Sequence, residues 1–297
     1  MRVAAGSRGA GEPGVSSLLY IAPAGLLYML FVLLPLLDGF WISLHSWDGV
    51  SSKHWVGLGN YRELASDGAV HTAFVHALVL CIFYAALPIA IGLFVSASLT
   101  RAQVRGMGFI QSALFLPQVI AAVVVGVSWR WLFDEYGPVN LALRKVGLGF
   151  VARAWLGDFT WALPAVGVIG TWVMLGLCMV LFLAGIRKIP TSLYDAARVD
   201  GAGAWREFFA VTLPGLRNEL AIATTLTVIA ALRAFDLIFV TTRGGPGDTT
   251  STPSLLIYTR AFLTGQVGLA AAIALVLAAV VFLVALGVTR GLEGSAE

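Results

Sequence analysis

The sequence predicts an all-α membrane protein with about six transmembrane helices, and three observations indicate this fold class. Hydrophobic residues make up 59% of the 297 residues and charged residues only 12%. That charged fraction is about half of the roughly 25% that is typical of soluble domains. The mean hydropathy of +0.88 is likewise strongly apolar. The apolar residues also form runs of the length, about 20 residues, that a helix needs to cross a bilayer.

Six apolar runs are long enough to span a membrane. The first, at about 18–43, exceeds the apolar region of a signal peptide and has no small-residue cleavage site, so we expect it to remain as a span. The fifth has many Ala and Thr residues, which is typical of a helix packed against other helices. The later five runs lie at about 71–99, 106–133, 161–186, 220–240 and 267–289. Residues 18–289 are therefore predicted to form one membrane domain, with a flexible tail at 1–17 and a short tail at 290–297.

Basic and aromatic residues predict the orientation of the spans. The connection between the second and third runs holds Arg101 and Arg105, and the connection after the fourth begins with Arg187 and Lys188. Basic residues accumulate on the cytoplasmic side, and tryptophans accumulate at membrane boundaries. The tryptophans near the proposed outer boundary are Trp41, Trp47, Trp55, Trp129, Trp131, Trp155 and Trp161. Both termini are therefore predicted to be cytoplasmic.

Several function classes are excluded by what the sequence lacks. The net charge of +3 comes from Lys and Arg residues scattered among apolar runs, without the cluster that a nucleic acid would need. The His and Cys residues show no metal-ligand spacing. The sequence has neither a G-x-x-x-x-G-K-[ST] phosphate loop nor an H-E-x-x-H motif, and no Ser/His/Asp arrangement is apparent. We therefore expect no catalytic site, metal, cofactor or nucleic-acid partner for this chain.

The connection at 187–217 is too long and too regular for a simple turn. Ser192 and Asp195 have the spacing of a capping box, which predicts a short helix that begins near Leu193. Asp200 and Gly201 then supply the residues of a turn.

A second short helix is predicted after that turn. Its aromatic face contains Trp205, Phe208 and Phe209, followed by Thr212 at the next helical position, while Arg206 and Glu207 face elsewhere. Pro214 is expected to break this helix before the fifth span.

This connection resembles the EAA loop of permeases in binding-protein-dependent ATP-binding-cassette (ABC) importers. Asp195 stands where that pattern has Glu, which preserves the carboxylate. The resemblance implies that the first short helix inserts into a cleft of an ATPase subunit, although Asp195 could instead serve mainly as a helix cap. The residues predicted to couple to the ATPase are Tyr194, Asp195, Ala196, Ala197, Asp200, Gly201, Ala202, Phe208 and Pro214.

A second patch also resembles sugar-type members of this family. Phe235 and Asp236 precede Gly244, Gly245 and Pro246, which by themselves would indicate only a turn over the outer surface. Together they are similar to the F-D…G-G-P pattern of the permease that resembles the larger maltose permease subunit. The segment 57–61, reading G-L-G-N-Y, and Leu116–Pro117 extend the similarity.

The resemblance implies the fold and the partners. We expect a type I ABC importer permease in a bacterial or archaeal cell membrane, in contact with lipid. A second homologous permease, a dimer of ATPase subunits carrying ATP and Mg²⁺, and an extracytoplasmic solute-binding protein are the implied partners. The implied solute is a sugar or an oligosaccharide.

Ionisable residues within membrane spans are candidates for the solute path. Arg233 and Asp236 have i, i+3 spacing, which favours a mutually neutralising pair on one helix face over direct solute contact, although both remain open. The aromatic and hydroxyl groups that could contact a sugar are Trp172, Tyr84, Thr224, Thr225 and Thr227.

Two other classes of membrane protein are alternatives. A secondary transporter would show an internal repeat with broken helices at matching positions, and no convincing repeat is found. A membrane scaffold would need neither the inner loop nor the outer Gly-Gly-Pro patch.

Overall fold

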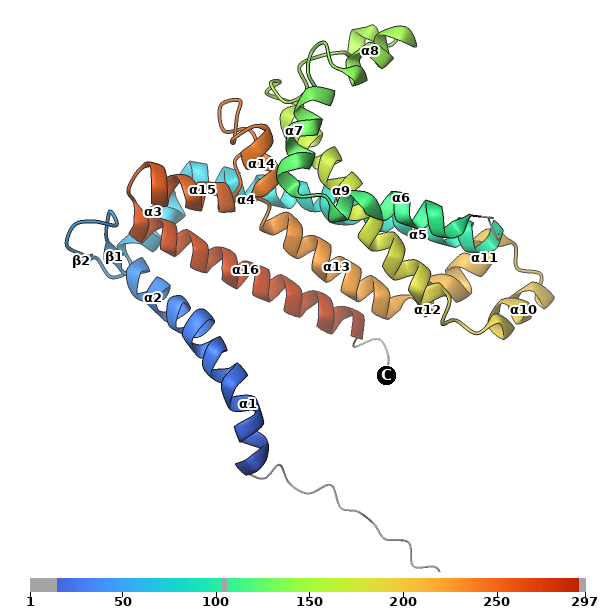
Figure 1. Cartoon of the computed structure of the whole chain (residues 1–297), viewed down its shortest axis with the longest axis horizontal. Coiled ribbons are helices and arrows are strands. Elements are labelled where there is room, and N and C mark those ends of the chain that lie inside the picture. The colour runs from blue at the N-terminus through green and yellow to red at the C-terminus, as the bar shows by residue number, and fades with distance from the viewer. Residues whose placement is uncertain (1–14, 103–105, 294–297) are drawn as a thin grey trace, which may run out of the picture.

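The computed structural model describes residues 15–102 and 106–293, and these residues are mostly helical (Figure 1). Residues 1–14 of the predicted N-terminal tail, residues 294–297 of the C-terminal tail and Arg105 lie outside the described residues.

The N-terminal part of the chain forms a long helical span and a hairpin. The span consists of α1 (Val15–Tyr28), the π-helical turn η1 (Met29–Leu33) and α2 (Leu34–Ser43). The strands β1 (His45–Ser46) and β2 (His54–Trp55) pair antiparallel. The next helices are α3 (Gly59–Ser66), α4 (Gly68–Cys81), the π-helical turn η2 (Ile82–Ala86), α5 (Leu87–Ala102), α6 (Met107–Val119), α7 (Ala122–Leu132), α8 (Pro138–Lys145) and η3 (Gly149–Val151).

The C-terminal part contains three further long helical segments and the connections between them. It comprises α9 (Ala162–Ile186), α10 (Thr191–Val199), α11 (Ala204–Glu207), η4 (Phe208–Thr212), α12 (Leu213–Gly215), α13 (Arg217–Leu232), α14 (Asp236–Thr241), α15 (Pro253–Tyr258), η5 (Thr259–Leu263) and α16 (Val267–Glu293).

Five helices in the described part are long and apolar enough to cross a membrane. They are Tyr20–Ser43, Gly68–Thr100, Ala162–Ile186, Arg217–Thr241 and Val267–Gly291. The predicted span at 106–133 is not a single helix, because Gly108–Val119 and Ala122–Leu132 meet at an angle of 98°. Ile120 and Ala121 have extended ψ angles of 134°, which interrupts the helical hydrogen bonds after Pro117. The number of spans is therefore five, or six if the bent pair crosses as one.

Three of the four π-helical turns in the described residues come just before a proline. In η1, η2 and η4 the last residue is followed two positions later by Pro35, Pro88 and Pro214. In each case the residue before the proline donates its N–H to the carbonyl five residues back, on Met29, Ile82 and Phe208. A proline ring in a helix clashes with the carbonyl four residues earlier, and a wide turn moves that carbonyl aside. The helix therefore continues through each of these prolines without a break.

The helix α9 lies at the centre of the bundle. Half of its most apolar window is buried, and Val166, Ile169 and Phe182 are fully enclosed. A Cβ on Gly176 would lie 2.4 Å from the carbonyl oxygen of Leu114 in α6. Close backbone approach at small residues is the usual way in which membrane helices pack.

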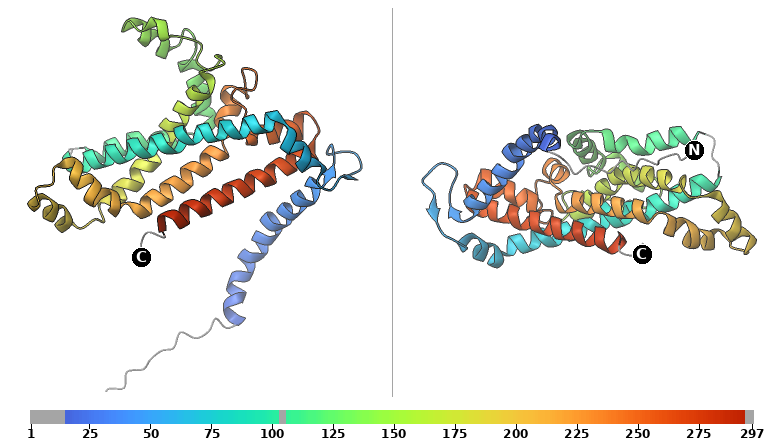
Figure 2. Two further views of the ribbon diagram at one scale, coloured as in Figure 1. Left: turned by 180° about the vertical axis from the view of Figure 1, so that it is seen from behind. Right: turned by 90° about the horizontal axis from the view of Figure 1, so that it is seen from below.

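The first span stands apart from this bundle. It contacts α16 through α2 near the hairpin, and α1 diverges from the other helices (Figures 1 and 2). None of its most apolar window is buried. The connection that holds α10 lies at the end of the bundle opposite the hairpin (Figure 1).

Candidate functional site

The first short helix of the 187–217 connection is α10, and it begins earlier than predicted. It starts at Thr191 after Pro190, and no side chain caps it. The prediction of a capping box was therefore wrong, because the backbone closes the first turn through a bond from Leu193 N to Pro190 O (3.1 Å). The Asp195 carboxylate is instead exposed and lies 3.4 Å from the guanidinium of Arg198.

The predicted turn after α10 is present and its geometry explains the glycine. Gly201 has φ +75°, a conformation that residues with a Cβ rarely adopt. Its N–H donates to Arg198 O (3.0 Å), and the N–H of Ala202 donates to Ala197 O (2.9 Å). These two bonds form a Schellman motif, which satisfies the last carbonyls of the helix. Asp200 and Ala196 are exposed beside it.

The second short helix has the predicted aromatic face, and most of that face is exposed. Trp205 and Phe209 are 67% and 58% exposed and stack on each other with centroids 6.4 Å apart. Glu207 and Thr212 are the buried residues. Trp205, Phe208 and Phe209 lie together as predicted, but Thr212 was wrongly grouped with them, because the π turn η4 places it beside Glu207, five residues earlier.

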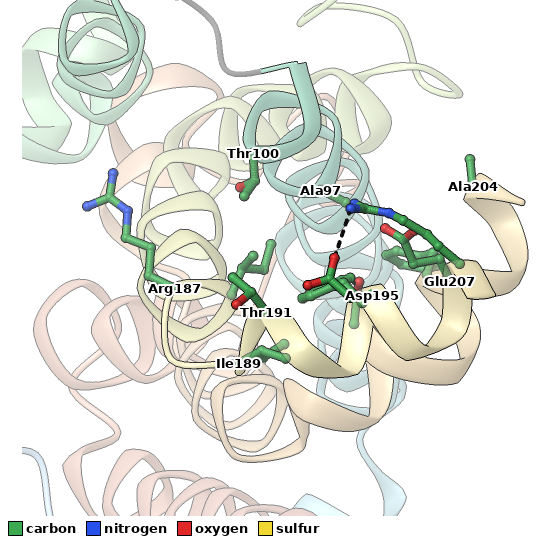
Figure 3. Close-up of a pocket in the computed structure, with 13 residues that line it drawn as sticks. Ala97, Thr100, Arg187, Ile189, Thr191, Asp195, Ala204 and Glu207 are labelled. Atoms are coloured by element: carbon green, nitrogen blue, oxygen red, sulfur yellow. Dashed lines mark hydrogen bonds and ion pairs between the residues drawn. The ribbon is translucent and has the colours of Figure 1, made fainter. Parts of the chain in front are cut away.

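Two side-chain contacts hold α10 against the second short helix. Arg198 Nε donates to Glu207 Oε2 (3.2 Å), and the hydroxyls of Tyr194 and Thr212 lie 3.2 Å apart. A cavity of about 380 Å³ lies between these helices and α5, and Phe208 also lines it. Figure 3 shows the carboxyl groups of Asp195 and Glu207 on one side of this cavity, while the Arg187 side chain points away from them. Sequence reasoning stated only that Glu207 faces away from the aromatic side chains, so it did not indicate the Arg198–Glu207 pair.

A tightly packed joint connects these helices to the spans. A Cβ on Gly215 would lie 2.6 Å from Ile189 Cδ1, and one on Gly185 would lie 2.5 Å from Leu216 Cδ2. Lys188 Nζ donates to Glu219 Oε1 (3.0 Å) across the same joint. The helix ends at Gly215, just beyond the predicted break at Pro214, because the wide turn η4 accommodates the proline ring.

The Gly-Gly-Pro loop, defined here as residues 242–252, is held by hydrogen bonds within itself and packs against the rest of the subunit. The Thr250 hydroxyl donates to Gly245 O (2.9 Å) and lies 2.7 Å from the Thr242 hydroxyl. Gly244 has φ +90° and precedes Gly245 and Pro246, which are joined by a cis peptide bond.

Two contacts fasten this loop to other elements. Thr252 Oγ1 donates to Ala234 O (2.8 Å), and His76 Nδ1 lies 2.8 Å from Ser251 O. His76 is thus a polar contact that no sequence signal had indicated.

Three of the predicted path residues meet at one cavity. Tyr84, Arg233 and Asp236 line a space of about 360 Å³ together with Ala230 and Phe235. Arg233 follows the end of α13 and Asp236 begins α14, so the two do not share one uninterrupted helix. The ion pairs of the described residues do not include Arg233 with Asp236. The favoured prediction of a mutually neutralising pair was therefore wrong.

The remaining path candidates do not line this cavity. Thr227 is fully buried and donates to Ala223 O (2.7 Å) in its own helix. The Thr225 hydroxyl is buried without a partner in the described part of the chain, and Thr224 is half-buried. Trp172 packs edge-on against Trp129 with centroids 5.6 Å apart.

These features define a multi-span membrane protein with an exposed helical segment at one end, and comparison with known proteins places it in a family. The family of the binding-protein-dependent transport system inner membrane component matches residues 89–291. The chain belongs to this family. It is a non-enzymatic, multi-pass membrane subunit of an ABC importer, which excludes the secondary-transporter and scaffold alternatives.

Curated relatives cover most of this chain. The probable ABC transporter permease protein YurN of Bacillus subtilis is 33% identical over 87% of this chain and 89% of its own length. The diacetylchitobiose uptake system permease protein NgcF of Streptomyces coelicolor is 32% identical over 91% of this chain and 81% of its own length.

Solved structures share the fold. A chain of a bacterial ABC transporter involved in the import of the acidic polysaccharide alginate matches with a TM-score of 0.77 and 22% identity, covering 94% of this chain and 96% of that chain. A chain of the alginate transporter in complex with an alginate pentasaccharide-bound periplasmic protein matches with a TM-score of 0.74, also at 22% identity, covering 91% of this chain and 92% of that chain.

Proposed function

We propose that this permease subunit carries a sugar or an oligosaccharide, which an extracytoplasmic binding protein delivers. Relatives are named for diacetylchitobiose uptake and for trehalose/maltose transport. A second homologous permease encloses the path together with this chain, and a dimer of ATPase subunits binds ATP and Mg²⁺. Both termini lie on the cytoplasmic side, where α10 meets the ATPase.

The exposed helix α10 is the observation that carries the proposal. None of its nine residues is buried, although Leu193 and Val199 are apolar and 51% and 88% exposed. An amphipathic helix that leaves apolar side chains uncovered is suited to enter a groove of a partner. The coupling residues on this surface are Asp195, Ala196, Asp200 and Gly201, while Tyr194 faces the second short helix, to which Phe208 belongs.

Coupling requires that movement of α10 reaches the spans. The contacts of Arg198 and Tyr194 join α10 to the second short helix, and the packed glycines at 185 and 215 join that helix to α9 and α13. A partner that favours one of two arrangements of α10 therefore biases the arrangement of both spans.

The cavity of Tyr84, Arg233 and Asp236 is the proposed solute contact within this chain. Its hydroxyl, guanidinium and carboxylate groups can exchange hydrogen bonds with sugar hydroxyls. It lies where α13 gives way to α14, so rearrangement at this break can open or close it.

Two glycines on either side of the turn provide a matched test of docking. Gly201 needs a positive φ, whereas Gly203 has φ −72°, and a Cβ added to either glycine would meet no neighbouring atom within 4 Å. Gly201→Ala strains the turn by about 1–2 kcal/mol, so we expect solute uptake and solute-stimulated ATPase activity of the complete transporter to fall at least about fivefold.

The control Gly203→Ala is expected to retain wild-type activity. Equal uptake and equal ATPase co-purification for the two variants would contradict the docking proposal. Uptake of a non-carbohydrate solute by the wild-type complex, with no response to any sugar, would contradict the solute class.

A further inference from the structure

A polar cavity lies at the hairpin end of the molecule, opposite α10. Its volume is about 300 Å³, and its lining comes from three separate segments: the hairpin, α3 and the residues that lead into α16. Figure 2 shows that these segments meet at one end of the bundle. We call this space the hairpin pocket; its charged, imidazole and amide side chains are Asp48, His54, Asn60, Glu63 and Gln266.

The hairpin pocket is fixed by backbone contacts. The N–H of Val267 donates to Trp47 O (2.9 Å), which ties the hairpin to the start of α16. A Cβ on Gly268 would collide with His45 O, so the two segments are in direct backbone contact. A pocket built this way keeps its shape without a ligand.

Two carboxylates give the pocket a negative charge. Asp48 Oδ1 accepts hydrogen bonds from the N–H groups of Val50 (2.9 Å) and Ser51 (2.7 Å). These bonds lower the pKa of Asp48 to about 2, so it is ionised at neutral pH. Glu63 is exposed and forms no ion pair within the described residues.

Two neighbouring cations, Lys53 and Arg260, contact lining residues of the pocket but not its carboxylates. Lys53 Nζ lies 4.5 Å from the centre of the Trp47 ring. Arg260 donates to Asp67 Oδ2 (2.7 Å) and to Gln266 Oε1 (2.8 Å). Neither residue lines the hairpin pocket, so its two carboxylates have no Lys or Arg beside them in the lining.

Asn60 adds an amide acceptor to the same pocket. The residue is 6% exposed, and its Nδ2 donates to Ser43 O (2.7 Å) and to His45 O (2.9 Å). Both amide hydrogens are thereby used, and the structure gives Oδ1 no partner among the residues it describes. A donor that enters the pocket can therefore bond to this oxygen.

We propose that the hairpin pocket accepts a lysine or arginine side chain of the binding protein that delivers the solute, an inference that rests on the proposed function. A protonated amine or guanidinium supplies several N–H donors and a positive charge, which matches two carboxylates and an amide oxygen. The pocket is placed for such a partner, since it lies at the end opposite α10. A bound metal ion fits less well, because in the described part of the chain no three His, Cys, Asp or Glu side chains converge as ligands.

The test measures ATPase activity of the complete transporter in lipid nanodiscs against the concentration of its solute-loaded binding protein. Glu63→Gln and Asp48→Asn each remove one charge while retaining the shape of the side chain. We expect each to raise the half-saturating concentration about twofold to fivefold, the size of one partly exposed ion pair, with the maximal rate unchanged. The half-saturating concentration of the wild type should also rise with salt more steeply than that of Glu63→Gln.

The matched control is Glu135→Gln, which removes an exposed carboxylate on the connection from α7 to α8, outside the pocket. It should saturate like the wild type. If the wild-type complex does not respond to any binding protein, the proposed function fails. If the wild type responds and both pocket variants saturate at the wild-type concentration, the pocket assignment alone is overturned. A chelator that shifts saturation of the wild type but not of Glu63→Gln would show a metal site and would also overturn it.

Discussion

The coupling segment (α10–α12) and the Gly-Gly-Pro loop are both connections between helices, but they differ in how far their side chains are buried and bonded within this subunit. Thr250 and Thr252 of the loop are fully buried, and their hydroxyls bond to backbone carbonyls of the chain itself. In α10, no residue is buried and two polar contacts hold it to the next helix. The loop finds its partners within this subunit, whereas the surface of α10 is left uncovered by it. Substitutions in the loop should therefore change stability, and substitutions in α10 should change coupling.

The largest expected effect on stability is at Gly244. A Cβ there would lie 2.9 Å from Leu255 Cδ2, and the residue has φ +90°. Gly244→Ala combines backbone strain with overpacking and should lower the free energy of unfolding by about 3 kcal/mol. Thermal unfolding in detergent measures this effect. Gly287→Ala in α16 has open space around the new Cβ and serves as the control, which should not be destabilised.

A smaller effect is expected from one hydroxyl in the same loop. Thr250→Val retains the shape of the side chain but removes the bonds to Gly245 O and Thr242 Oγ1. The buried carbonyl and hydroxyl left behind should cost about 2 kcal/mol. Thr264→Val removes only an exposed bond to Arg260 O and should unfold like the wild type. Equal melting temperatures for the two variants would show that the loop is not self-supporting.

The coupling segment should respond to Arg198→Ala by local opening. The substitution removes the bond to Glu207 that joins α10 to the second short helix. We expect the free energy of local opening of α10 to fall by about 1 kcal/mol, with little change in global unfolding. Hydrogen exchange of residues 191–199 measures it. Asp195→Asn weakens only the exposed contact to Arg198 and should exchange nearly as the wild type does; faster exchange throughout the spans would contradict a local effect.

The smallest effect concerns the pH dependence of the hairpin, which, like the Gly-Gly-Pro loop, is held by hydrogen bonds within itself. The Asp48 carboxylate accepts hydrogen bonds from Val50 and Ser51, and these bonds lower its pKa from 3.8 to about 2. The stabilisation of the folded hairpin by this carboxylate is therefore fully present above about pH 4 and is lost as the pH falls through 2. The difference in melting temperature between the wild type and Asp48→Ala should shrink as the pH is lowered from about 5 to about 2.5. A difference that grows as the pH falls would contradict the lowered pKa of Asp48.

The spans and the position of the coupling segment could be predicted from the sequence because long apolar runs and a turn glycine are local signals. The Asp200–Gly201 turn follows from backbone sterics alone. The position of Thr212 and the Arg233–Asp236 pair were predicted wrongly, since both inferences assumed uninterrupted helices with about 3.6 residues per turn. A π turn in one case and a helix break in the other changed which side chains are neighbours. The Pro214 that follows η4 was visible, but it indicated a break rather than a wide turn.

The Asn60 contacts were also beyond sequence reasoning. Its partners, Ser43 and His45, are 17 and 15 residues away, and nothing local marks them. The G-L-G-N-Y segment was recognised only as a resemblance, while the structure gives its asparagine a role in holding the hairpin.

The packed joint at Gly185, Gly215 and Leu216 has a mechanical consequence. Backbone and side chains already touch at this joint. It therefore leaves no free volume that could absorb a small displacement of the coupling segment. Under the proposed coupling, a displacement of α10 should therefore reach α9 and α13 together. The sensitivity of transport to added volume at these two glycines should therefore exceed that of any residue on the exposed surface of α10.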